Sequence, residues 1–79
     1  MATCKAEFLI EPFKEGSQGA HVVAAIEAVS EAGFNPVVGP FGTSVEGAPG
    51  EVLEALAQMI EAAIGNGASK IAITTTVVA

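Results

Sequence analysis

The order of two hydrophobic periods along the chain constrains its fold more than any other feature. Apolar residues at every second position are typical of strands, whereas apolar residues that recur about every three to four positions are typical of amphipathic helices. Read from the N-terminus, these periods and the turn residues between them predict six elements: strand 5–12, helix 18–32, strand 34–39, strand 43–46, helix 51–64 and strand 70–78.

This β-α-β-β-α-β order with short connections is the ferredoxin-like pattern among α+β folds. We therefore expect a four-stranded antiparallel sheet with both helices on one face. Right-handed crossovers place the first and third strands in the centre. Pro36 cannot donate a ladder hydrogen bond, so its strand is expected at an edge. Seventy-nine residues suffice for a single domain of this kind, residues 1–79, and not for two.

The alternation within the strands also assigns the two faces of the sheet. The residues expected to point at the helices are Phe8, Ile10, Val45, Ile71, Ile73 and Val77. Those expected on the open face are Glu7, Leu9, Glu11, Ser44, Glu46, Ala72, Thr74 and Thr76. At one end of the sheet, the loop after the first strand is expected to meet the turn before the third, bringing together Phe13, Ser17, Phe41 and Thr43.

The charge balance narrows the class of partner. The chain has nine glutamates and three lysines, with no arginine and no aspartate, and its formal net charge is −6. Nucleic acids and anionic membrane surfaces are therefore poor partners, because both are bound through clustered cations. A neutral or cationic small ligand suits this field better. No apolar run approaches the ~20 residues that span a bilayer, and the N-terminus does not resemble a signal peptide, so we expect a cytoplasmic protein.

The chain has few of the residue types that catalysis and metal binding use. Cys4 and His21 are the only cysteine and histidine, which excludes an internal disulfide and a zinc set. His21, in the first turn of its helix, is expected to be exposed. A Ser-His-Asp triad needs an aspartate, and Glu46 as a general base lacks a second catalytic group. We predict no enzyme, no metal and no cofactor. A domain this small gains stability by oligomerisation, which we expect.

The segment Pro40-Phe41-Gly42-Thr43-Ser44-Val45-Glu46-Gly47 resembles the P-M-G-T-x-I/V-E-G signature of the thiamine-binding protein family. The likeness extends over almost the whole chain, from Ala6 to the last strand. It implies a small ferredoxin-like protein that binds thiamine or its hydroxymethylpyrimidine moiety. It also implies assembly through the sheet, as a homodimer or tetramer joined at sheet faces or edges.

The resemblance carries a ligand site onto particular residues. Thr43, Ser44 and Glu46 fall on the signature, and Phe41 stands where the family usually has methionine. Glu11 completes the candidate set. Carboxylates and hydroxyls would bond an aminopyrimidine, an aromatic ring would stack on it, and the acidic field would favour a cationic thiazolium.

Roles without a ligand remain alternatives for the same residues. Glu46 can be a solvated strand acid, Thr43 and Ser44 can stabilise the turn, and Phe41 can pack on its own domain. The alternative for the whole protein is a structural or regulatory self-association module without a small-molecule ligand. Such a module would have a dry interface around Leu9, Ala72 and Val38 on the open face.

Overall fold

The computed structural model describes residues 2–12, 19–39 and 42–78. Its helices and strands follow the predicted order: β1 (Thr3–Glu11), α1 (Ala20–Glu31), β2 (Val37–Gly39), β3 (Gly42–Gly47), α2 (Pro49–Gly65) and β4 (Lys70–Val78). The strands form one antiparallel sheet in the order β2-β3-β1-β4. The ferredoxin-like prediction is confirmed, with β1 and β3 in the centre and β2 at an edge.

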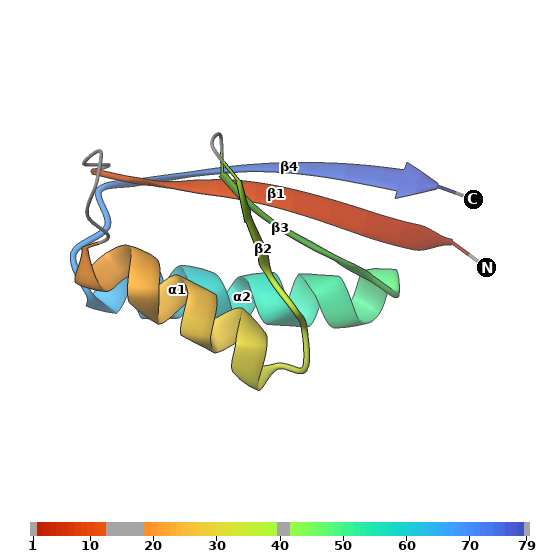
Figure 1. Cartoon of the computed structure of the whole chain (residues 1–79), viewed down its shortest axis with the longest axis horizontal. Coiled ribbons are helices and arrows are strands. Elements are labelled where there is room, and N and C mark those ends of the chain that lie inside the picture. The colour runs from red at the N-terminus through yellow and green to blue at the C-terminus, as the bar shows by residue number, and fades with distance from the viewer. Residues whose placement is uncertain (1, 13–18, 40–41, 79) are drawn as a thin grey trace.

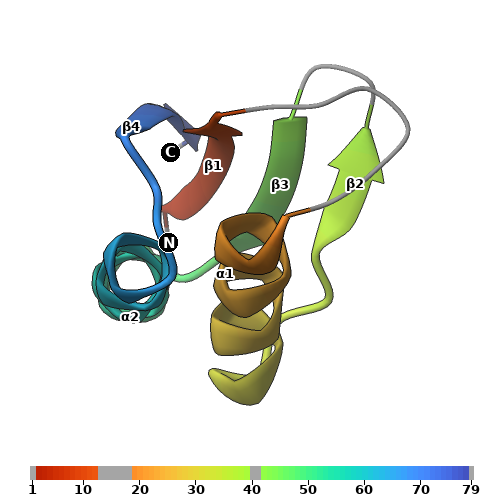
Figure 2. The same cartoon turned by 90° about the vertical axis from the view of Figure 1, so that its left-hand side faces the viewer.

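The molecule has two layers, with the sheet on one side and both helices on the other (Figure 1). The two helices lie next to each other beneath the sheet, and no described helix or strand covers its other face (Figure 2). Both termini lie at the same end of the molecule (Figure 1).

The core forms between the layers because every second residue of the central strands is apolar and points at the helices. Its buried members are Cys4, Ala6, Phe8 and Ile10 of β1, Val45 of β3, Ala25 and Val29 of α1, and Val52, Ala55, Leu56, Met59 and Ala63 of α2. The small residues on α1 and α2 let the two helices approach each other and the sheet closely.

Two expectations need correction, and a third, for Val77, holds only in part. The second strand is only three residues long, because it begins after Pro36 instead of at Phe34. Val77 lies opposite Cys4 on the helix side, but its side chain is 63% exposed. His21 is buried and not exposed as expected, and its Nε2 donates a hydrogen bond to the Pro12 carbonyl oxygen at 2.6 Å. This bond ties the start of α1 to the end of β1.

The directions of the strand backbone groups follow from two observations. A Cβ added to Gly42 would lie 2.8 Å from the Phe8 carbonyl oxygen, so that oxygen points towards β3. The Glu11 carbonyl accepts a hydrogen bond from the Ser69 N–H, just before β4. Because both backbone groups of one strand residue point to the same side and successive residues alternate, even residues of β1 bond to β3 and odd residues bond to β4.

The register carries this alternation to the outer strands. Thr43, Val45 and Gly47 are paired with even residues of β1, so their backbone groups point inward, and those of Ser44 and Glu46 point towards the β2 edge. In β4, the even residues bond to β1 and the odd residues point outward. The backbone N–H and C=O groups of Ser44 and Glu46 in β3, and of the odd residues in β4, therefore point away from β1. Any partner of these groups must lie on that outer side.

Candidate functional site

Ser44 and Glu46 of the predicted site lie together beside a groove. Both project from the open face of β3, Ser44 half-buried and Glu46 exposed. The groove has a volume of about 1010 Å³ and opens at the β2 edge of the sheet. Since small-molecule sites are commonly about 300–1,000 Å³, it has room for a drug-sized ligand.

The groove exists because β2 is short. Val37 pairs with Ser44, and the same register would next pair Pro36 with Val45 and Asn35 with Glu46. β2 begins only after Pro36, whose ring holds φ at about −65°, outside the usual range of a regular antiparallel strand. On the β2 side, the half of β3 from Val45 to Gly47 therefore has no neighbouring strand among the described residues, and the groove runs along it.

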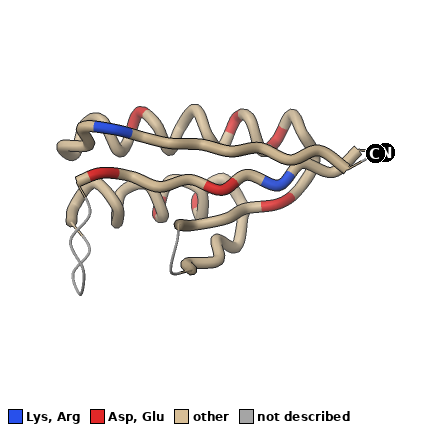
Figure 3. The backbone as a smooth tube through the Cα atoms, turned by 90° about the horizontal axis from the view of Figure 1, so that it is seen from above, with Lys and Arg blue, Asp and Glu red and all other residues tan. Residues whose placement is uncertain are grey.

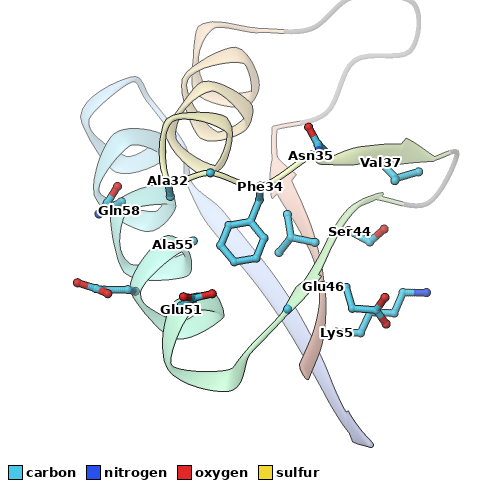
Figure 4. A pocket seen from close by; sticks show the side chains of 14 residues that line it. Lys5, Ala32, Phe34, Asn35, Val37, Ser44, Glu46, Glu51, Ala55 and Gln58 are labelled. Atoms are coloured by element: carbon cyan, nitrogen blue, oxygen red, sulfur yellow. The ribbon is translucent and has the colours of Figure 1, made fainter. Parts of the chain in front are cut away.

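Phe34 forms the aromatic wall of the groove. Figure 4 shows its ring in the centre of the lining residues, between the side chains of β3 and those of α2. The ring lies on the helix side of β3, where it packs against the core. A Cβ on Gly47 would lie 2.8 Å from Cε1 of this ring and 3.8 Å from Cγ2 of Val52. The signature's last glycine thus leaves the space that the ring occupies.

The charge in the groove is mainly negative. Glu46 contributes one carboxylate from β3, and Glu51 and Glu54 contribute two more from the start of α2. Lys5, the cross-strand neighbour of Glu46, is the ammonium among the lining residues. Figure 4 shows Glu51 across the groove from Glu46 and Lys5. Three carboxylates against one ammonium favour a cation or a neutral molecule rich in N–H donors. In Figure 3 the acidic positions, in red, are spread along the helices and strands, and the basic positions, in blue, are few.

The structure separates Thr43 from its neighbours in the signature. Thr43 is 6% exposed and points to the helix side with Val45, whereas Ser44 and Glu46 point to the open face. The strand alternation sends consecutive residues to opposite faces. Thr43 lines a different, small apolar hollow with Phe8 and Val22.

Glu11 lies at the far end of β1. It is six positions along the strand from Lys5, the partner of Glu46, which corresponds to about 20 Å at strand spacing. Its Oε2 lies 3.7 Å from Nζ of Lys70, whose side chain is largely exposed, whereas that of Glu11 is partly exposed. The structure therefore does not bring Glu11 to the groove. Phe41, Phe13 and Ser17 lie outside the described residues.

Sequence reasoning did not identify the residues that complete the groove: Phe34, Glu51, Glu54 and Gln58. We expected Phe34 to begin a strand and the α2 residues to form a solvated helix face. Pro36 was the available signal, since a proline two residues after Phe34 shortens the edge strand and exposes the edge of β3. Among the described residues no group of three His, Cys, Asp or Glu side chains is placed to hold a metal ion. No described helix is long and apolar enough to cross a membrane.

Solved structures with the same fold come from several organisms. A domain of unknown function from Bacillus cereus is 22% identical, with a TM-score of 0.71 over 98% of this chain and 75% of that one. A hypothetical protein from Methanocaldococcus is 22% identical, with a TM-score of 0.71 over 100% and 81% of the two chains. A candidate thiamine biosynthesis/salvage protein from Thermotoga maritima is 20% identical, with a TM-score of 0.69 over 95% and 81%. At these identities the likeness concerns the fold alone.

Comparison with curated proteins gives no match. The family model described as "Thiamine-binding protein" matches residues 6–78, which include β1 from Ala6, both helices and the other three strands. The resemblance noted in the signature is thus confirmed along the length of the domain, and the chain belongs to the thiamine-binding protein family.

Proposed function

We propose that this protein reversibly binds thiamine or a thiamine-like aminopyrimidine in the groove beside β3. One observation carries the proposal: Ser44 and Glu46, two residues of the family signature, line the same groove as Phe34. Membership in the thiamine-binding family supports a ligand of this class.

The groove offers the contacts that such a ligand needs. The Ser44 hydroxyl can accept a hydrogen bond from an exocyclic amine, and the Glu46 carboxylate adds negative charge beside it. Phe34 offers an aromatic surface to a planar heterocycle. The thiazolium of thiamine carries a positive charge, which the carboxylates of Glu46, Glu51 and Glu54 attract.

We propose binding without catalysis. The titratable side chains that line the groove are three glutamates and a lysine, and the lining contains neither histidine nor cysteine. Proton transfer at neutral pH usually uses groups whose pKa lies near that pH. Capture and release of the intact ligand is the simplest use of this set. A cytoplasmic location stays a prediction.

Isothermal titration calorimetry with thiamine and with hydroxymethylpyrimidine tests the proposal. We expect saturable binding of both, with an accompanying rise in the melting temperature. A matched pair of variants locates the site. Ser44→Ala removes a hydroxyl that lines the groove, whereas Thr74→Ala removes a hydroxyl on the same face of the sheet, in β4, that does not line the groove. Ser44→Ala should weaken binding and Thr74→Ala should not. No heat and no melting shift at millimolar ligand would overturn the proposal.

Self-association through β4 is the second candidate, and the outer edge of that strand favours it. Nine residues run without a neighbouring strand on that side in the described part of the chain, and Lys70 carries the strand's one charge. Sheet edges of this length are usually protected by charges, prolines or bulges.

A second copy of the chain fits this edge. With two β4 strands antiparallel about Thr74, the outward groups of Ile71, Ile73, Thr75 and Val77 all meet outward groups of the partner. Exposed Val77 then lies opposite Ile71 of the other copy. The dry open-face interface is a weaker alternative, because Val38 pairs with Thr43 and lies on the helix side with it. Light scattering coupled to size exclusion measures the subunit number; a monomer at high concentration would exclude the β4 dimer.

A further inference from the structure

The backbone of Glu46 lies at the free edge of β3 and faces the groove. The N–H and C=O of Ser44 are engaged by Val37 of β2. Those of Glu46, two residues further, point the same way because strand residues alternate. Within the described part of the chain, no strand residue is paired with Glu46 on this side, and no backbone hydrogen bond joins it to residues 34–36.

A single strand residue with both groups free presents a donor and an acceptor side by side. An aminopyrimidine carries the complementary pair on one edge, where the ring nitrogen N3 accepts and the neighbouring amine on C4 donates. In an antiparallel sheet, the N–H and C=O of one residue bond to the C=O and N–H of the opposite residue. The two ligand atoms are close enough together to take the place of that opposite residue's groups. The match is one of hydrogen-bonding pattern and is independent of the Glu46 side chain.

We propose that the backbone N–H and C=O of Glu46 bind the N3–C4–NH₂ edge of the aminopyrimidine, so that the ring occupies the place of the missing residue of β2. This rests on the proposed function and specifies how its ligand is recognised. The amine donates to the Glu46 carbonyl oxygen, and the Glu46 N–H donates to N3. The carboxylate of Glu46 supplies charge and does not select the ring.

The surroundings of this edge fit a flat, uncharged ring with a cationic substituent. A ring bonded to the edge of β3 lies in the plane of the sheet, and Phe34 lies below that plane, on the helix side. The ligand face can therefore pack on the aromatic ring while its edge bonds to the strand. Glu51 and Glu54 lie at the far side of the groove, where a substituent on the pyrimidine would extend.

A pair of ligands that differ only at this edge tests the assignment. The probes are hydroxymethylpyrimidine, which carries the 4-amino group, and its 4-oxo counterpart, which presents N3–H and a carbonyl in the reverse pattern. Two mismatched hydrogen bonds should weaken binding at least about tenfold. The same preference should persist in the Glu46→Gln variant, because that substitution leaves the backbone unchanged. If the side chain selected the ring, Glu46→Gln would abolish the preference.

Amide hydrogen exchange followed by NMR gives a second, direct readout. In the free protein the Glu46 amide should exchange quickly, and saturating hydroxymethylpyrimidine should slow it at least about tenfold. The Val45 amide, which points inward to β1, is the internal control and should be slow in both states.

The outcomes separate this inference from the proposed function. Binding of the amino ligand with discrimination and protection of Glu46 supports both. Binding with an unprotected Glu46 amide and equal affinity for the 4-oxo ligand leaves the function standing and overturns the backbone assignment. Absence of binding by both probes overturns the function and this inference together.

Discussion

The two edges of the sheet expose the same backbone groups in different surroundings. At the β2 edge, the segment Val45–Gly47 that lacks a partner in β2 is short, and it borders a groove that Phe34 and the start of α2 also line. At the other edge, β4 runs for nine residues without a neighbouring strand on its outer side in the described part of the chain. A short walled edge admits a small flat molecule, whereas a long open edge admits another strand. The shape around the edge, more than the hydrogen-bonding groups, selects the partner.

The largest effect is expected where β2 and β3 are joined. Gly42 has a φ of +146° and would place a Cβ 2.8 Å from the Phe8 carbonyl oxygen. Gly42→Ala therefore forces a side chain into a conformation that only glycine adopts readily and against backbone that cannot rotate away. We expect a loss of about 3 kcal/mol in the free energy of unfolding, measured by urea denaturation.

Gly65→Ala is the matched control for this substitution. Gly65 ends α2 with ordinary backbone angles, and an added Cβ meets nothing within 4 Å. The free energy of unfolding of the Gly65→Ala variant should rise by less than about 1 kcal/mol, because alanine is the better helix former. Similar losses in the two variants would show that the Phe8 contact does not matter.

A proline pair at the long edge sharpens the contrast between inward and outward groups. Thr74 bonds to Glu7 of β1, whereas the N–H of Thr75 points outward. Thr74→Pro removes a ladder bond and should cost about 1–3 kcal/mol more in unfolding free energy than Thr75→Pro. Thr75→Pro should instead dissociate a β4 dimer, as seen by light scattering. Equal stability losses would contradict the inward direction of the Thr74 N–H and the outward direction of the Thr75 N–H.

The sequence was sufficient for the fold and for part of the site. Two periods of hydrophobicity predicted the order of elements, and alternation placed Ser44 and Glu46 on the open face. The same alternation places Thr43 on the other face, although the signature groups the three residues together. The signature's glycines also have structural roles, since Gly42 avoids the Phe8 carbonyl and Gly47 makes room for Phe34.

The groove itself could not be predicted, because it depends on contacts between distant segments. Pro36 indicated an edge strand, but not that the strand would start after it. The position of the Phe34 ring is set by Gly47 and Val52, which are distant in sequence. Likewise, Glu51 and Glu54 have the spacing of a solvated helix face, and only the path of α2 brings them to the groove.

The packing of Phe34 on Gly47 can be tested at the short edge. Gly47→Ala places a Cβ 2.8 Å from Cε1 of the Phe34 ring, which must shift. We expect a cost of about 1–2 kcal/mol and weaker binding of hydroxymethylpyrimidine. In a Phe34→Ala background the same substitution should be nearly neutral, because the clash is gone. Equal costs in both backgrounds, measured as a double-mutant cycle, would show that the two residues do not interact.

The smallest effect is expected from the acidic wall across the groove. Glu51→Gln combined with Glu54→Gln removes two exposed carboxylates while keeping similar shapes. Because exposed charges are screened, thiamine affinity should fall only about two- to fivefold at low salt, and less at high salt. Uncharged hydroxymethylpyrimidine should bind the variant nearly as well as the parent, since its edge contacts do not involve these residues. Equal losses for the two ligands in calorimetry would mean that Glu51 and Glu54 shape the groove and do not act through charge.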